Sequence, residues 1–369
     1  MLRFSQADLV VSSALVVFPA RAGVRGRAMR AFSVSWRVFP AMLVLVLALG
    51  STPAYASVLN IIPTFASSIT SDPNAATIES TINTAINYYD STFTTATAAP
   101  IGVTIQFQEG GGLGGSSAAT YTIPYQNFIS ALTVASSGNS TDVAALANLP
   151  ISTTNPVTGS THITVKTAEL RALGFSAAQF PNGGFDGTIT LNTSLTTPGS
   201  PGSSLEFSLL ATTEHEIDEV LGIGSDLGTP FSDPSPEDLF RYASSGVRSY
   251  TTNGSALAYF SLDGTTHLAQ FDNQNDGGDF GDWQSNPLPN GVGPKVQDAF
   301  GTPGSSPTLA TDAGIPEIIA LDAIGYNLAE TSEPSSLILC GSVLVIIGGA
   351  TRWRVGLRKN GHVVSDLSR

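Results

Sequence analysis

The sequence alternates short apolar segments with amphipathic ones, and this order limits the chain to folds that combine strands and helices. The apolar segments VLNIIPTF (58–65) and IGVTIQF (101–107) enclose a stretch that opens with SDPN, a typical helix start. Apolar side chains then recur at helical spacing at Ile78, Ile82, Ile86 and Tyr89. The pattern predicts a strand-helix-strand unit, and we expect an α/β (α+β) fold.

The same alternation continues to residue 328, with turn-forming residues between the elements. We expect strands at STHITV (160–165) and FDGTITLNTSL (185–195), and a hairpin about Asp263-Gly264. Helices are predicted at 125–134, 167–175, about 205–221, from 235 onward and at 315–328. The stretch 230–310 is otherwise rich in loops, and the glycine run EGGGLGGSS (109–117) is interpreted as a flexible turn.

The first 56 residues have the features of a secretory signal. Two arginines precede the apolar run VFPAMLVLVLALG, and STPAYAS follows with Ala54 and Ala56 in an A-x-A cleavage pattern. We therefore expect residues 1–56 to be a signal region and the exported chain to begin at Ser57, with Met29 as an alternative translation start. A membrane-spanning helix is the other interpretation, but the apolar run is short for one.

The C-terminal segment, residues 331–369, combines a short apolar run with a basic end. The run Leu337–Ala350 is followed by Arg352, Arg354, Arg358 and Lys359. This order resembles the PEP-CTERM sorting signal of exported Gram-negative proteins, although SEP (332–334) stands in place of the Pro-Glu-Pro box. The resemblance implies an exosortase-type enzyme as a partner and transient contact of the tail with the inner membrane. An ordinary tail anchor is the alternative.

The charge between these two segments excludes several classes of partner. The chain has 16 Lys and Arg and 29 Asp and Glu, but residues 57–351 hold only five of the basic residues and 27 of the acidic ones. Such a surface repels nucleic acid and anionic headgroups and attracts cations. The only cysteine, Cys340, lies in the C-terminal apolar run, so the central region has neither disulfides nor cysteine ligands for zinc.

The segment TTEHEIDEVLGIGS (212–225) places candidate metal ligands within a predicted helix. His215 and Glu219 are one helical turn apart, so their side chains can converge on one ion. Glu216 projects about 100° away, where it could act as a general base on a metal-bound water. The segment therefore predicts a metal site with hydrolytic chemistry.

Several elements together resemble the metzincin-like metalloproteases, notably exported bacterial ones with PEP-CTERM tails. They are the strand GTITLNTS, the helix HEIDEVLG, the segments DLFRY and GDFGDW, and the final helix EIIALDAIGYNL. The likeness covers most of 57–328. It implies one metalloprotease-like domain, 57–330, with a mixed sheet, an active-site helix and a loop-rich C-terminal subdomain.

The resemblance also implies roles for particular residues. His215 would be a zinc ligand and Glu216 the general base, and DGTITLNTS (186–194) would be the edge strand that pairs with an extended polypeptide substrate. Glu219 and Ser225 stand where that family has histidine, and no methionine follows IGS. The ligand set of this chain must therefore differ from the family's.

A third ligand has to come from outside the helix. Zinc accepts carboxylate oxygen, so Glu219 preserves the spacing that a histidine would give. We predict Asp238 in SPEDLFRY as the third ligand, with Glu237 and His267 as alternatives and Asp226 last. Two carboxylates and one imidazole would make zinc-bound water less acidic, and such an oxygen-rich set also suits calcium or manganese.

Two functions fit these observations. The first is an exported zinc-dependent metallopeptidase, weakened where glutamate replaces histidine. The alternative is a non-catalytic extracellular matrix or surface protein, in which Glu214, Asp218 and Glu219 form a solvated acidic face. DNQNDGGD (272–279) is interpreted as an acidic turn and not a calcium loop, because Trp283 occupies the position where an EF-hand requires glutamate.

Overall fold

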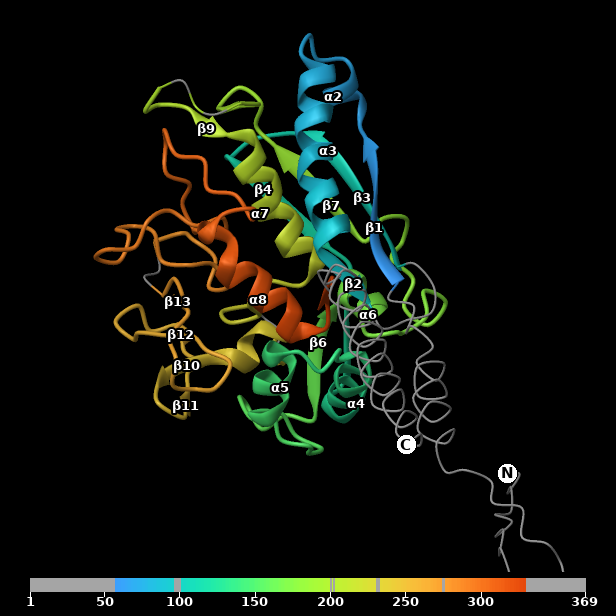
Figure 1. Ribbon diagram of the computed structural model, residues 1–369, viewed down its shortest axis with the longest axis vertical. Coiled ribbons are helices and arrows are strands. Elements are labelled where there is room, and N and C mark those ends of the chain that lie inside the picture. Colours follow the sequence, from blue (N-terminus) through green and yellow to red (C-terminus); the bar gives the residue numbers. More distant parts are fainter. Residues whose placement is uncertain are drawn as a thin grey trace, which may run out of the picture. The chain divides into compact units, whose positions relative to one another are not determined.

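The computed structural model describes residues 57–95, 101–199, 201, 203–229, 233–273 and 276–329 (Figure 1). The expected signal region 1–56 and the expected sorting segment 331–369 lie outside the described residues. Within the described part of the chain, no helix combines the length and the apolar character needed to cross a lipid bilayer.

A six-stranded mixed sheet organises the fold, in the order β14-β2-β1-β3-β7-β4. Three of its strands are parallel: β1 (Ser57–Phe65), β3 (Ile101–Glu109) and β7 (Gly187–Leu191). Three pair antiparallel with their neighbours: β2 (Phe93–Thr95), β4 (Gly114–Ala118) and β14 (Asn327–Leu328). The α/β class with a mixed sheet is confirmed, and β1, α3 and β3 form the predicted strand-helix-strand unit.

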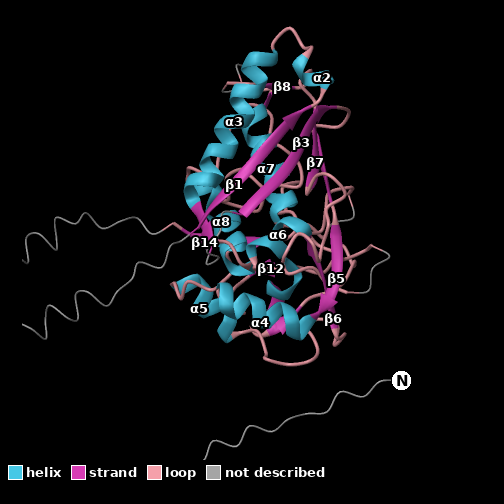
Figure 2. Cartoon of the chain, turned by 90° about the vertical axis from the view of Figure 1, so that its right-hand side faces the viewer, coloured by secondary structure: helices cyan, strands magenta, loops and turns pink. Residues whose placement is uncertain are grey.

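Three helices pack together beside this sheet (Figures 1 and 2): α3 (Ala75–Thr92), α7 (Leu209–Leu221) and α8 (Ile315–Ile324). Helix α3 contacts β1, and α7 contacts both β7 and β4. The apolar side of α3 is buried at the spacing seen in the sequence, through Ile78, Ile82, Ile86 and Tyr89. Since α7 also contacts α3 and α8, it occupies the centre of the molecule's main core.

Alternate residues of the central strands face these helices. Leu59 and Ile61 of β1 are 0% and 3% exposed, whereas their neighbours Val58 and Ile62 are 50% and 44% exposed. The same alternation runs along β3. This two-residue period is the one that the apolar segments predicted.

The remaining elements form smaller units. β5 (Thr120–Pro124) pairs with β6 (His162–Lys166), and β8 (Thr196–Thr197) with β9 (Phe207–Ser208). A four-stranded sheet contains β10 (Arg241–Ser244), β11 (Val247–Arg248), β12 (Tyr259–Phe260) and β13 (Ala269–Gln270). The other helices are α2 (Ser67–Thr70), α4 (Tyr125–Ala135), α5 (Ser140–Ala147), α6 (Thr167–Ala172), η1 (Glu237–Phe240) and η2 (Asp312–Gly314). The hairpin about Asp263-Gly264 is confirmed, because β12 and β13 pair antiparallel across it.

Two predictions about the edge of the main sheet are wrong. The strand GTITL (187–191) is not an edge strand, since β7 pairs with β3 on one side and with β4 on the other. The edge strand is β4, Gly114–Ala118, which the sequence suggested was a flexible turn. Glycine and serine have little strand propensity, so β4 owes its conformation to pairing with β7.

Helix α7 has clear local signals at both ends. The Ser208 hydroxyl accepts a hydrogen bond from the Ala211 backbone N at 3.2 Å and caps the first turn. The helix ends at Gly222, whose φ of +152° is a conformation that favours glycine. Glu214 and Asp218 are only 2% and 0% exposed, so the hypothesis of a solvated acidic face is wrong for these two residues.

Candidate metal centre

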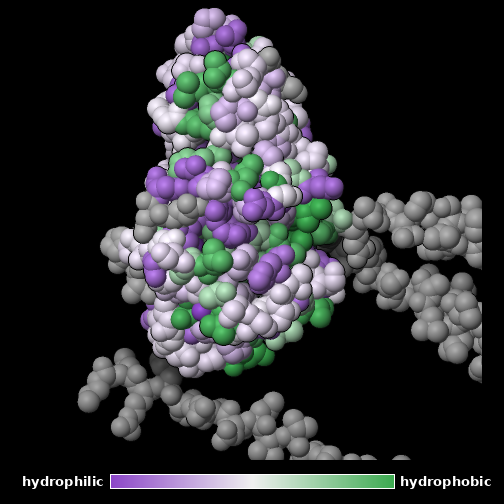
Figure 3. Space-filling model, turned by 90° about the vertical axis from the view of Figure 1, so that its left-hand side faces the viewer, coloured by the Kyte–Doolittle hydropathy of each residue, from purple (hydrophilic) through white to green (hydrophobic). Residues whose placement is uncertain are grey.

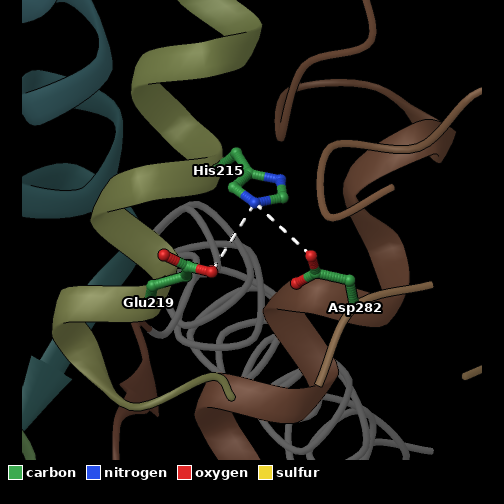
Figure 4. A group of neighbouring side chains, drawn as sticks. All are labelled: His215, Glu219 and Asp282. Carbon is green, nitrogen blue, oxygen red and sulfur yellow. Dashed lines mark ion pairs between the residues drawn. The ribbon is translucent and has the colours of Figure 1, made fainter. Parts of the chain in front are cut away.

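Three side chains from two distant segments converge beside α7 (Figure 4). His215 and Glu219 lie one turn apart on the helix, and Asp282 comes from the loop between β13 and η2. The Nε2 atom of His215 is 3.7 Å from Glu219 Oε1 and 3.8 Å from Asp282 Oδ2. One ligand atom of each lies within 4.8 Å of the other two, and no other group of His, Cys, Asp or Glu among the described residues has this geometry.

The spacing suits a small tetrahedral cation. In a tetrahedral zinc site with ligands at about 2.0–2.2 Å, two ligand atoms are about 3.4 Å apart. The measured separations of 3.7 and 3.8 Å are close to that value, so small side-chain adjustments would bring the three atoms to one ion. One imidazole and two carboxylates form a donor set that zinc accepts, and carboxylate oxygens also suit calcium and manganese.

His215 is oriented with one ring nitrogen toward this group. Its Nδ1 lies 3.0 Å from the Val296 carbonyl oxygen, so the neutral ring donates Nδ1–H there and directs the lone pair of Nε2 toward the group, where the Gln297 side-chain nitrogen also lies 3.3 Å away. Burial lowers the pKa of His215, but the surrounding carboxylates, first that of Asp282, outweigh burial and raise the pKa well above its usual value. The carboxylates around His215 therefore stabilise positive charge, either on the imidazole ring or on an ion bound to its Nε2.

Asp282 is held by a buried network that reaches α8. The side-chain amide of Gln297 donates to Asp282 Oδ1 at 2.8 Å, which leaves Oδ2 toward His215. The backbone N of Gln297 and the indole N of Trp283 both donate to Glu317 Oε1 at 2.9 Å. Burial raises the pKa of Asp282 to about 8, although the charge of His215 opposes the shift. A carboxyl in this position ionises readily only beside a cation.

Glu219 is the ligand candidate that contacts the edge strand. The hydroxyl of Ser116, on β4, donates to Glu219 Oε2 at 2.6 Å and leaves Oε1 toward His215. Burial favours a higher pKa for Glu219, but its hydrogen bond to His215 and the charges of His215 and Lys166 lower the pKa to about 2. Glu219 is therefore ionised and ready to bind a cation.

Glu216 lies beside the group and packs under the edge strand. A Cβ atom on Gly114 would lie 2.3 Å from Glu216 Oε1 and 2.7 Å from Thr212 Cγ2, so a side chain at this position would displace Glu216. Glu216 Oε2 has no hydrogen-bond partner. Burial raises the pKa of Glu216 to about 9, despite the opposing charge of His215. A bound dication would lower this pKa again and restore the carboxylate.

The group opens into a cleft of about 580 Å³. Its walls come from β4, from α7 and from loop residues within 277–282 and 295–302. Leu113, Phe207 and Phe300 supply apolar surface to it, and Asp279 and Lys295 supply charge. Figure 3 shows the side of the molecule on which these loops lie in Figure 1, and hydrophilic side chains gather across its middle.

The structure brings His215, Glu216 and Glu219 together as predicted but places Asp238 elsewhere. Asp238 Oδ1 accepts a hydrogen bond from the Ser225 hydroxyl at 2.5 Å, and Oδ2 accepts one from the Ser235 backbone N at 2.9 Å. Its carboxylate thus ties η1 to the loop that follows α7. Asp282 lies at the third position of the group, for which the sequence predicts Asp238.

The alternative third ligands also lie outside the group. Glu237 Oε2 accepts a hydrogen bond from the Gly224 backbone N at 2.6 Å, and the Asp226 backbone N donates to Asp238 Oδ2 at 3.2 Å. The ring of His267 stacks on Tyr259 with centroids 3.9 Å apart. The expected acidic turn 272–279 lies partly outside the described residues, which omit 274–275.

The sequence alone does not predict that Asp282 joins this group, although GDFGDW (278–283) is one of the segments that resemble the family. The signal in that segment is Gly281, where a Cβ atom would lie 2.5 Å from the Gly224 Cα atom and 2.7 Å from the Ser225 backbone N. Only glycine permits this approach, and it brings the loop against the turn that ends α7. Asp282 follows immediately and so reaches His215.

Comparison of this chain with protein-family models, with curated proteins and with solved structures finds no match.

Proposed function

We propose that this chain is an exported, zinc-dependent metallopeptidase of metzincin-like form. The observation that carries the proposal is the convergence of His215, Glu219 and Asp282 on one point, with Glu216 beside them. The cleft next to this point is bordered by the edge strand of the main sheet. A metal site, a neighbouring carboxyl and an accessible strand edge are together what hydrolysis of a polypeptide requires.

The chemistry follows from the roles of these residues. When bound, zinc would lower the pKa of a coordinated water and polarise the peptide carbonyl. Glu216 would accept the proton of the attacking water at its carboxylate and pass it to the departing amine. Glu219 and Asp282 together offset the charge of a dication, so we expect slower hydrolysis than a three-histidine site would give.

Strand β4 offers a place for an extended substrate. It pairs with β7 along one side only, and it ends the main sheet among the described residues. Ser116 of β4 contacts Glu219, so a polypeptide paired along the strand would pass the metal group. Main-chain pairing of this kind binds a polypeptide with little dependence on its sequence.

The family resemblance and the terminal segments support the same proposal. An edge strand beside the helix with H-E-x-x-E agrees with a metzincin-like arrangement, whereas a third ligand from the Asp282 loop departs from the family's histidine at Ser225. The signal-like segment 1–56 and the PEP-CTERM-like segment 331–369 support export, with sorting by an exosortase-type enzyme.

A second candidate is a non-catalytic matrix or surface protein that binds calcium or manganese. The observation that favours it is the ligand set, in which two of the three groups are carboxylates. Metal content and hydrolysis separate the two candidates.

The test measures bound metal and hydrolysis of unstructured polypeptides by the purified, zinc-loaded protein. We expect about one zinc ion per chain together with hydrolysis, and His215→Ala should lose both. His267→Ala is the matched control, because this histidine stacks on Tyr259 outside the group and should keep both properties. Metal without hydrolysis in the wild type would favour the surface protein, and equal metal content in wild type and His215→Ala would refute the site.

A further inference from the structure

A second cavity lies next to the metal group, farther along the edge strand. Its volume is about 230 Å³, and it is lined by Ser117 and Ala118 of β4, by α6 and by the loop that follows α7. Ser116, Glu219 and Asp279 line both this cavity and the main cleft. A polypeptide paired with β4 would therefore pass the main cleft on one side of the metal group and this cavity on the other.

Glu169 of α6 is the unusual residue of this cavity. It is 0% exposed, and neither oxygen of its carboxyl group has a hydrogen-bond partner. An unsatisfied polar group in such a position costs on the order of 1–3 kcal/mol, so packing gives no reason for a glutamate here. A Cβ atom on Gly222 would lie 3.1 Å from Glu169 Oε2, which places the carboxyl beside the end of α7.

The cavity contains more acidic than basic groups. Lys166 is the basic residue of its lining, and its ammonium group donates to the carbonyl oxygens of Glu219 at 2.5 Å and Ile223 at 2.7 Å. Lys166 is thus held at the C-terminal end of α7, where a cation is favourable. Since Glu219 belongs to the metal group, the acids left to this cavity are Glu169, Asp226 and Asp279.

We propose that this cavity is the subsite that receives a basic side chain, lysine or arginine, of the polypeptide substrate. The inference rests on the proposed peptidase function. Glu169 offers two free acceptors to an ammonium or guanidinium group, and Asp226 and Asp279 add negative charge around them. The main cleft differs, because Leu113, Phe207 and Phe300 give it apolar walls.

The test compares peptides that differ at one position, with lysine, leucine or glutamate placed in turn at each site near the cleaved bond. At one position, we expect kcat/KM to be at least about tenfold higher for lysine than for leucine, the effect of roughly one additional charge-assisted hydrogen bond. Glu169→Gln keeps the shape and removes the carboxylate that would pair with the bound cation, so this ratio should fall below about threefold while zinc content stays that of the wild type. Asp226→Asn should reduce the ratio by a smaller factor, and Asp312→Asn, an exposed acid on η2, should leave it unchanged.

Fluorescence anisotropy measures how tightly the same peptides bind to zinc-loaded Glu216→Gln protein. This measurement tests the subsite separately from the peptidase activity. The subsite is supported if the lysine peptide binds more tightly than the leucine peptide and Glu169→Gln abolishes this difference. If the wild type nevertheless cleaves neither peptide, the peptidase proposal fails and the subsite stands. Equal binding and equal cleavage of the lysine and leucine peptides at every position would overturn the subsite and leave the peptidase proposal standing. If Glu169→Gln does not fold, the wild-type comparison and Asp226→Asn still decide the question.

Discussion

Helix α7 presents acidic residues to two different surroundings. On the side of the cleft, Glu219 lies with His215 around one point, where a cation can bind. On the side of α3 and α8, Glu214 accepts a hydrogen bond from the Leu309 backbone N at 2.9 Å, and Asp218 accepts one from the Tyr89 hydroxyl at 2.8 Å. Carboxyl groups thus lie on both sides of the helix, but the charged form of the carboxyl is favoured only on the cleft side, at Glu219.

The difference lies in which protonation state each surrounding favours. Burial raises the pKa of Glu214 to about 7 and that of Asp218 well above its usual value, so the core favours their neutral forms. His215 instead lowers the pKa of Glu219 to about 2 and keeps it charged. Glu214 and Asp218 therefore support the fold as neutral hydrogen-bonding groups, whereas Glu219 is ionised and available to a cation.

The largest expected effect separates Glu216 from Glu214, which flank His215 in the sequence. Glu216→Gln should lower hydrolysis by about 10²–10⁴-fold with zinc content unchanged, because an amide cannot take the proton from water. Glu214→Gln is the matched control and should retain hydrolysis, since Glu214 faces Leu309 in the core. Zinc analysis and kcat/KM on one peptide measure both, and an active Glu216→Gln protein would remove Glu216 from the mechanism.

The next effect is on stability, and it concerns Asp218. A solvated acidic face would make Asp218→Ala neutral, but Asp218 is 0% exposed and bonded to Tyr89. We expect Asp218→Ala to lower the free energy of unfolding by roughly 2–3 kcal/mol, through the cavity and the lost hydrogen bond, while the Tyr89 hydroxyl keeps the Glu214 carbonyl oxygen as its acceptor at 2.7 Å. Asp218→Asn, which keeps the shape and the acceptor, should cost less than about 1 kcal/mol in the same urea titration. Equal stability of Asp218→Ala and wild type would contradict the structural role.

Much of the fold could be predicted because its signals are local. Ile78, Ile82 and Ile86 recur at helical spacing, and the apolar segments on either side pair as β1 and β3. The edge strand could not be predicted in this way, since Gly114 and Gly115 have no side chains to indicate a strand. Its position depends on pairing with β7 and on the close packing of Gly114 against Glu216, and both contacts join residues far apart in the sequence.

The candidate site also contains residues that the sequence could predict and one that it could not. His215 and Glu219 are one turn apart, so helix geometry alone brings them together. Asp282 lies far along the chain, and its position depends on the approach of Gly281 to the turn after α7 and on a hydrogen bond from Gln297. Sequence spacing contains no information on these contacts, which is why an acid nearer in the sequence, Asp238, was the prediction.

A smaller effect should come from pH, in the metal-free protein. Below pH 4.5, the usual pKa of Glu214, this carboxyl is protonated in both the folded and the unfolded chain. Between pH 4.5 and about 7 the unfolded chain loses the proton and the folded chain keeps it, so stability falls as pH rises. We expect Glu214 to account for a loss of about 2–3 kcal/mol over this range. Urea titrations of wild type and Glu214→Gln at pH 5 and 7.5 should differ in this slope, and parallel slopes would contradict the assignment.

The smallest effect should come from Ser116, which connects the edge strand to the cleft side of α7. Its hydroxyl donates to Glu219 Oε2 at 2.6 Å and orients the carboxylate with Oε1 toward His215. Ser116→Ala removes this partner while Glu219 remains charged, so we expect zinc affinity to fall by roughly tenfold, as for other groups that orient a metal ligand. Ser117→Ala is the matched control, because it changes the neighbouring residue of the same strand, whose hydroxyl does not contact Glu219 in the described part of the chain. Competition with a zinc chelator measures both affinities. Equal affinities in the two variants would mean that β4 borders the cleft without positioning the metal ligand, and binding of substrate along the strand would then be independent of the metal.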